Sequence, residues 1–102
     1  MIKFFKNLFA STDYKQLIAD GALVIDVRSK AEYKAGAIEK SINIPLDRVE
    51  KELKKIVDLN QTLIFCCRSG NRSAQATRIV TSHGASAYNG GAWNSLQRKI
   101  KN

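Results

Sequence analysis

The chain has 102 residues, of which 44% are hydrophobic and 25% charged, with a single proline. This length fits one domain with one core, and this composition excludes a disordered or collagen-like chain. The net charge of +8 favours encounter with anions, but the basic residues are spread without the clustered arm or interleaved aromatics of a nucleic-acid binder. We therefore expect a solvated basic surface and no nucleic-acid partner.

The first ten residues do not have the pattern of a secretory leader, because Lys3 and Lys6 interrupt their apolar run. No segment of the sequence approaches the length of apolar chain that spans a membrane. We expect residues 1–10 to be an N-terminal extension and residues 11–102 to form the single domain. The expected compartment is the cytoplasm, which keeps thiols reduced.

The domain begins with a helix followed by a strand. Residues 12–19 have helical periodicity, and Gly21 ends the helix. Residues 22–27 are a short, nearly all-apolar run rich in branched side chains, which is typical of a buried parallel strand. Its polar end emerges at Asp26 and Arg28.

The next segments predict another helix, a short strand and a charged helix. Ser29 caps a helix that extends through residue 35, and residues 41–44 predict a short edge strand that Pro45 ends. Residues 46–57 are predicted to form one amphipathic helix whose charged residues face solvent.

The second half repeats the alternation of strand and helix. Residues 62–66 are predicted to form the second strong strand, and residues 73–82 are predicted to form a helix. A weak strand at 85–88, a turn at 89–91 and a last helix at 92–100 complete the chain. Strands that alternate with helices indicate an α/β layer fold with a mainly parallel sheet.

Cys67 follows the second strong strand, at the edge where open α/β sheets place their ligand sites. Backbone amides of residues 68–73 can turn inward as a concave array, and the helix after them adds its positive N-terminal end. With the positive charges of Arg68 and Arg72 beside it, Cys67 is predicted to have a lowered pKa and to act as a nucleophile.

Cys66 is predicted to be different from its neighbour. As the last strand residue it points to the opposite face of the sheet, so we expect a packed and inert thiol. Adjacent cysteines rarely form a disulfide, because the bond would strain the peptide between them. The single histidine, His83, has no partner at metal-ligand spacing. We therefore expect neither a disulfide framework nor a metal site.

Several motifs occur in order along nearly the whole chain: Leu23–Arg28, Glu32–Tyr33 with Gly36–Ile38, Ser41–Leu46, Cys67–Ser73, and Gly90–Gly91 with Trp93. In their order and spacing these motifs resemble the rhodanese family. Two positions depart from the family pattern: Ala37 replaces a frequent histidine, and Tyr88 replaces a common aliphatic residue.

The resemblance implies a three-layer fold, with a mainly parallel five-stranded sheet and helices on both faces. It implies a sulfurtransferase that carries sulfane sulfur as a persulfide on Cys67, from thiosulfate or a similar anionic donor to cyanide, a small thiol or a protein thiol. No metal or organic cofactor is required, and we expect a monomer. The residues of the active-site loop are then Cys67, Arg68, Ser69, Gly70, Asn71, Arg72 and Ser73.

The roles of the charged residues remain open at this point. Arg68 either attracts anionic donors or is simply solvated. Arg72 either orients toward the bound anion or anchors the loop to a carboxylate such as Asp26, and we favour the anchor. Asp26, Arg28 and Glu32 are predicted to form a scaffold of ion pairs.

Two other functions fit parts of the sequence. Cys66, five intervening residues, Arg72 and Ser73 formally spell the signature of cysteine-loop phosphatases and arsenate reductases. Counted from Cys67 the loop is one residue shorter, which suits a single sulfur atom better than a tetrahedral oxyanion. The second alternative is a non-catalytic interaction module, which an intact cysteine and loop argue against.

Overall fold

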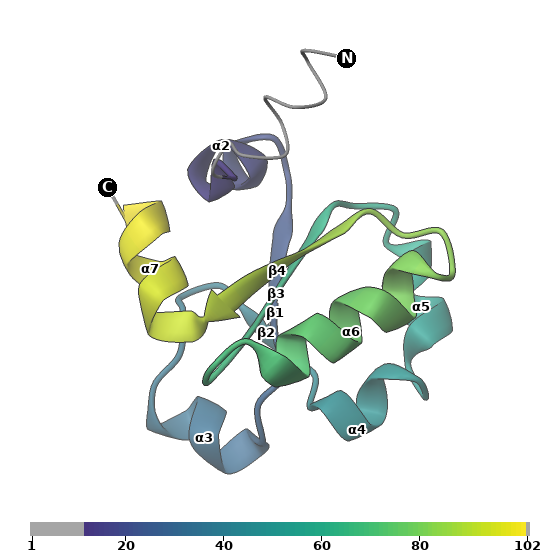
Figure 1. Ribbon diagram of the computed structural model, residues 1–102, viewed down its shortest axis with the longest axis horizontal. Coiled ribbons are helices and arrows are strands. Elements are labelled where there is room, and N and C mark those ends of the chain that lie inside the picture. Colours follow the sequence, from purple (N-terminus) through teal and green to yellow (C-terminus); the bar gives the residue numbers. More distant parts are fainter. Residues whose placement is uncertain (1–11, 102) are drawn as a thin grey trace.

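The structure is a computed structural model, and it describes residues 12–101 of the chain (Figure 1). The predicted extension at residues 1–10 lies outside the described residues. In chain order the elements are α2 (Tyr14–Ala19), β1 (Leu23–Asp26), α3 (Lys30–Ala35), β2 (Ile42–Asn43), α4 (Leu46–Val49), α5 (Leu53–Asp58), β3 (Leu63–Cys67), α6 (Asn71–Thr81), β4 (Ala87–Ala92) and α7 (Trp93–Lys101).

Local sequence accounts for the ends of the first helices. Gly21 follows α2 with a φ of +105°, a left-handed conformation that suits glycine. Ser29 caps α3 as predicted. Its hydroxyl accepts a hydrogen bond from the backbone amide of Glu32, and the Glu32 carboxylate accepts one from the backbone amide of Ser29. This reciprocal capping box pairs two backbone donors that the first turn of a helix leaves unpaired.

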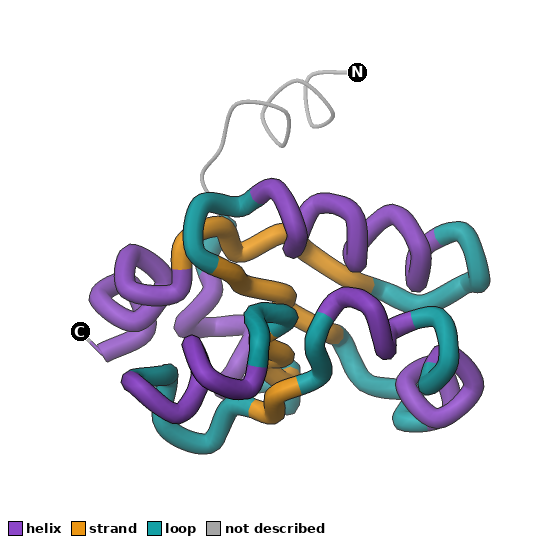
Figure 2. Tube along the Cα trace, turned by 90° about the horizontal axis from the view of Figure 1, so that it is seen from below, coloured by secondary structure: helices purple, strands orange, loops and turns teal. Residues whose placement is uncertain are grey.

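The four strands form one parallel sheet in the order β2-β1-β3-β4. Their side chains alternate between two faces, and helices cover both of them (Figure 2). Helices α4, α5 and α6 cover one face, where the fully buried residues include Ile25, Leu63 and Phe65. Helices α2 and α7 cover the other face, where Ile64 and Leu96 are fully buried. The α/β three-layer prediction is therefore confirmed.

The strand count and one helix were predicted wrongly. Within residues 12–101 the sheet has four strands where the family resemblance implied five. The predicted helix 46–57 is two helices, α4 and α5, separated at residues 50–52. No glycine or proline marks this break. Both pieces pack against α6, so the tertiary arrangement overrides the continuous helical periodicity.

The end of the sheet beside α6 also differs from the prediction. The predicted turn at residues 89–91 lies inside β4, where the pairing with β3 shifts register and leaves Gly90 as an extra residue. A Cβ atom on Gly90 would lie 2.9 Å from methyl carbons of Ile64 and Leu96. The absence of a side chain at Gly90 therefore lets β4 pack closely against Ile64 of β3 and Leu96 of α7.

Candidate active site

Strand β3 ends at Cys67, one residue later than predicted, and α6 begins at Asn71, two residues earlier than predicted. Only three residues, 68–70, connect them. Gly70 makes this short turn with a φ of +97°. The tight connection brings the first amides of α6 close to the cysteine at the carboxyl end of the strand.

The sulfur of Cys67 is surrounded by hydrogen-bond donors of this loop. The amide of Gly70 lies 3.0 Å from Sγ and the amide of Ser73 lies 3.4 Å from it. The hydroxyl oxygen of Ser73 is 3.3 Å from Sγ. Both Cys67 and Ser73 are fully buried. The sulfur therefore lies in the concave array of backbone amides that the sequence predicted.

The electrostatics of this array favour a thiolate. Burial by itself raises the pKa of Cys67, but hydrogen bonds from the Ser73 hydroxyl and from the amides of Ser73, Ser69 and Gly70 outweigh it, so the net pKa is lowered. The N-terminus of α6, an 11-residue helix, adds a positive dipole end at the same place. Cys67 therefore has the properties of an activated cysteine.

Cys66 points to the opposite face, as predicted. It is fully buried in the cluster that α2 and α7 cover, among side chains that include Val24, Ile64 and Leu96. Burial, followed by the nearby charge of Asp26, raises the pKa of its thiol far above the ordinary value. The two adjacent cysteines thus occupy opposite electrostatic environments.

Arg72 anchors the loop, but its partner is not the predicted one. Its guanidinium nitrogens Nη1 and Nη2 donate to the two carboxylate oxygens of Glu32, at 2.7 and 3.0 Å. The same carboxylate accepts the amide of Ser29 in the capping box. The active-site loop is therefore tied to the start of α3. Asp26 does not take this role, because its carboxylate is already paired with the guanidinium of Arg28.

Of the three residues predicted to form a scaffold of ion pairs, Asp26 and Arg28 pair with each other, whereas the carboxylate of Glu32 pairs with Arg72 instead. Nη2 of Arg28 lies 2.7 Å from the Asp26 carboxylate, and both side chains are almost fully buried. The guanidinium also donates to the carbonyl oxygens of Glu32 and Gly36 and lies 4.6 Å from the centre of the Trp93 ring. These contacts connect β1, α3 and α7 beneath the site.

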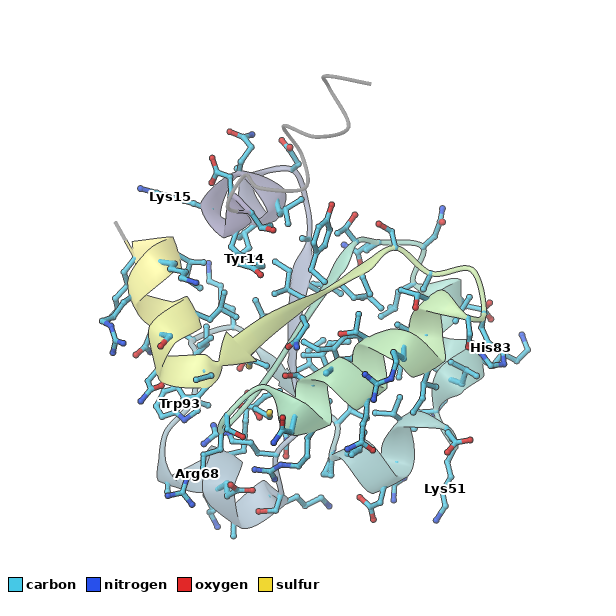
Figure 3. The ribbon with its side chains drawn as sticks, in the orientation of Figure 1. Tyr14, Lys15, Lys51, Arg68, His83 and Trp93 are labelled. Atoms are coloured by element: carbon cyan, nitrogen blue, oxygen red, sulfur yellow. The ribbon has the colours of Figure 1, made fainter. Side chains whose placement is uncertain are left out.

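Arg68, Ser69 and Asn71 are exposed on the outside of the loop. Figure 3 shows Arg68 near the end of the sheet where Trp93 also lies, with its side chain on the outside of the molecule. Within residues 12–101 no carboxylate forms an ion pair with Arg68. Its charge is therefore available to a solute that approaches the loop.

Sequence reasoning missed Asn89, which it placed in a turn. The Asn89 carboxamide oxygen accepts the Ser73 hydroxyl at 2.6 Å, and its amide nitrogen donates to the carbonyl of Gly70 at 3.2 Å. The available signal was a polar residue next to two glycines, directly after the last strand that the sequence predicted. Only the pairing of β4 with β3 brings it to the loop.

The pattern of the rhodanese-like domain family matches residues 10–96 of the chain. The chain belongs to this family. It is 37% identical over 91 residues to a rhodanese domain-containing protein of Drosophila melanogaster, and the match covers 74% of this chain and 82% of that protein. It is 33% identical over 88 residues to the human thiosulfate:glutathione sulfurtransferase, over 71% of this chain and 75% of the human protein.

A solved structure supports the same assignment. The structure of a human single-domain sulfurtransferase is similar to this rhodanese-like domain, with a TM-score of 0.66 and 31% sequence identity. The similarity covers 83% of this chain and 90% of that one. The rhodanese-like sulfurtransferase family is thus supported by both sequence and fold.

The geometry of the rhodanese-like domain disfavours the phosphatase alternative. That alternative needs Cys66 as the nucleophile at the centre of the loop, but the Cys66 side chain is fully buried on the other side of the sheet.

Among residues 12–101 no group of His, Cys, Asp and Glu side chains could hold a metal ion. In the same part of the chain no helix has both the length and the apolar character needed to cross a bilayer.

Proposed function

We propose that this rhodanese-like domain transfers sulfane sulfur through a persulfide on Cys67. The thiolate of Cys67 attacks the outer sulfur of thiosulfate, or of a similar anionic donor. A bond forms between Sγ and that sulfur, the sulfur–sulfur bond of thiosulfate breaks, and its electron pair leaves with sulfite. Cys67 then carries a terminal sulfur with a negative charge.

The observation that carries this proposal is the set of donors around Sγ. The amides of Gly70 and Ser73 and the N-terminal end of α6 stabilise a negative charge at the loop centre. The same donors can stabilise the charge of the terminal sulfur. Because Arg72 is occupied by Glu32, the loop depends mainly on backbone amides for this work. Arg68, on the exposed side of the loop, supplies a charge that attracts the anionic donor.

The second half of the cycle returns Cys67 to its starting state. A nucleophilic acceptor, cyanide or a thiolate, attacks the terminal sulfur; the bond between that sulfur and Sγ breaks, and its electron pair returns to Sγ as the thiolate. A small thiol is the acceptor class we favour, because the human relative is named for transfer from thiosulfate to glutathione. Such an acceptor reaches the loop from the exposed side that Arg68 occupies.

Mass spectrometry of the intact protein tests the proposal. Incubation with thiosulfate should add one sulfur atom, and cyanide or glutathione should remove it. Cys67→Ser should form no adduct. Cys66→Ala, the matched control at the neighbouring thiol, should form it normally. A protein that forms no adduct but turns over a generic aryl phosphate would contradict the proposal.

A further inference from the structure

The Ser73 hydroxyl lies between two hydrogen-bond acceptors. Its oxygen is 3.3 Å from Sγ of Cys67 and 2.6 Å from the carboxamide oxygen of Asn89. A hydroxyl has one hydrogen to donate. It can therefore donate to only one of these acceptors at a time.

The orientation of the Asn89 amide is determined by its other contacts. The amide of Gly91 donates to the carboxamide oxygen at 3.0 Å, and the carboxamide nitrogen donates to the carbonyl of Gly70 at 3.2 Å. Exchanging the oxygen and nitrogen would place two donors together and two acceptors together. The oxygen of Asn89 therefore faces Ser73, and because this oxygen has no hydrogen, the Ser73 hydroxyl is the donor.

The fold places Asn89 there by means of the bulge in β4. Strand β4 lies beside α6 (Figure 1), and Asn89 is paired with Phe65 of β3 just before the register shift. A Cβ atom on Gly70 would be 3.5 Å from the Cα of Gly91, so this segment packs closely on the active-site loop. Bulges beside active sites commonly redirect a side chain in this way.

The charge on Cys67 determines whether the Ser73 hydroxyl donates its hydrogen bond to Asn89 or to Sγ. When Ser73 donates to Asn89, only its oxygen lone pairs face Sγ, and they can accept the S–H hydrogen of a neutral thiol. A thiolate needs the opposite arrangement, in which the hydroxyl donates to Sγ. When the thiol proton is lost to solvent, the Ser73 hydroxyl must therefore rotate, so that its hydrogen points to Sγ instead of to the carboxamide oxygen of Asn89.

We propose that Asn89 is a positioning residue that competes with Cys67 for the hydroxyl hydrogen of Ser73, and so limits how readily Cys67 becomes a thiolate. This inference rests on the proposed function of Cys67 as the nucleophile. In the persulfide, Sγ is no longer an anion, and the hydroxyl returns to Asn89. Asn89 thus gives the hydroxyl an acceptor in each state of the cycle in which Sγ carries no charge.

A double-mutant cycle tests the competition. The four proteins carry Ser73 or Ser73→Ala combined with Asn89 or Asn89→Ala, all in a Cys66→Ala background that leaves one thiol. The rate of alkylation by iodoacetamide is measured against pH. With Ser73 present, Asn89→Ala should lower the pKa of Cys67 and speed alkylation below the midpoint roughly three- to tenfold, the effect of one hydrogen bond.

The Ser73→Ala background removes the hydroxyl and separates the two roles of Asn89. Asn89→Ala also loses the contact with the Gly70 carbonyl, but it does so in both backgrounds. In Ser73→Ala, Asn89→Ala should therefore not speed alkylation. An equal effect of Asn89→Ala in both backgrounds would overturn the proposal, as would slower alkylation when Ser73 is present.

A second variant covers the case in which Asn89→Ala does not fold. Asn89→Asp keeps an acceptor for the hydroxyl and adds a negative charge, so it should slow alkylation, and more strongly with Ser73 than with Ser73→Ala. An equal slowing in both backgrounds would count against the proposal. Alkylation does not require sulfur transfer, so this outcome is separate from that of the thiosulfate adduct.

Discussion

Replacing Glu32 by glutamine tests whether the anchor between the active-site loop and α3 stabilises the domain. The Glu32 carboxylate accepts hydrogen bonds from Nη1 and Nη2 of Arg72 and from the backbone amide of Ser29. Glutamine keeps an oxygen that can accept the Ser29 amide, and it is accepted at this position of a capping box. Glu32→Gln therefore removes the charge of the anchor while the start of α3 keeps its cap.

The pKa of Glu32 gives the magnitude of the stability that Glu32→Gln should lose. Hydrogen bonds from Arg72 and then from the Ser29 amide lower this pKa from 4.5 to about 2, which at face value corresponds to about 3 kcal/mol of stability. The Arg72 and Glu32 side chains are 34% and 33% exposed, so water screens the pair and reduces its contribution. We expect Glu32→Gln to lower the free energy of unfolding by about 1–2 kcal/mol at neutral pH.

The sign of the pH dependence follows from the lowered pKa. A carboxylate that is more acidic in the folded state contributes its full stability above its unfolded pKa, and this contribution is lost as the pH falls through the folded pKa. For Glu32 the window runs from about 4.5 down to about 2. The difference in stability between the parent protein and Glu32→Gln should therefore shrink across this window.

Urea denaturation at a series of pH values measures this difference. Glu52→Gln is the matched control, because Glu52 has a similar exposure of 26% but pairs only with near neighbours in the sequence, Arg48 and Lys55. We expect the control to lose about 0.5 kcal/mol or less. If Glu32→Gln is no less stable than Glu52→Gln, or if its deficit does not change with pH, the Glu32–Arg72 pair does not anchor the loop.

Three further predictions address the site and the sheet. In a Cys66→Ala background, the pH profile of alkylation should give Cys67 a midpoint below the ordinary 9.0; a midpoint at or above this value would contradict the thiolate. Arg68→Ala should raise the KM for thiosulfate about two- to fivefold and weaken its salt dependence, and an unchanged KM would leave Arg68 as solvated surface. Gly90→Ala should cost about 1–3 kcal/mol in urea unfolding, because the added methyl group would lie 2.9 Å from side-chain carbons of Ile64 and Leu96; an unchanged free energy of unfolding would mean that β4 adapts to the added methyl group.

Much of the site was predictable because its main features are local in sequence. The apolar run that ends at Cys67, the glycine three residues later and the helix after it lie within one short segment. Backbone geometry within that segment is enough to direct amides toward the sulfur. The opposite orientations of Cys66 and Cys67 follow from the alternation of a strand. The capping of α3 by Ser29 was predictable for the same reason, since its partner is three residues away.

The partner of Arg72 and the role of Asn89 were decided only by the tertiary structure. Glu32 is forty residues from Arg72, and Asn89 is sixteen residues from Ser73. The identity of each partner depends on where α3 and β4 lie relative to the loop. The bulge at Gly90 depends in turn on the pairing of two strands. No local periodicity encodes such long-range distances, because they arise when separate elements pack on one sheet. The sequence by itself thus determined the cysteine and its amide array, whereas tertiary packing determined what holds that array in place.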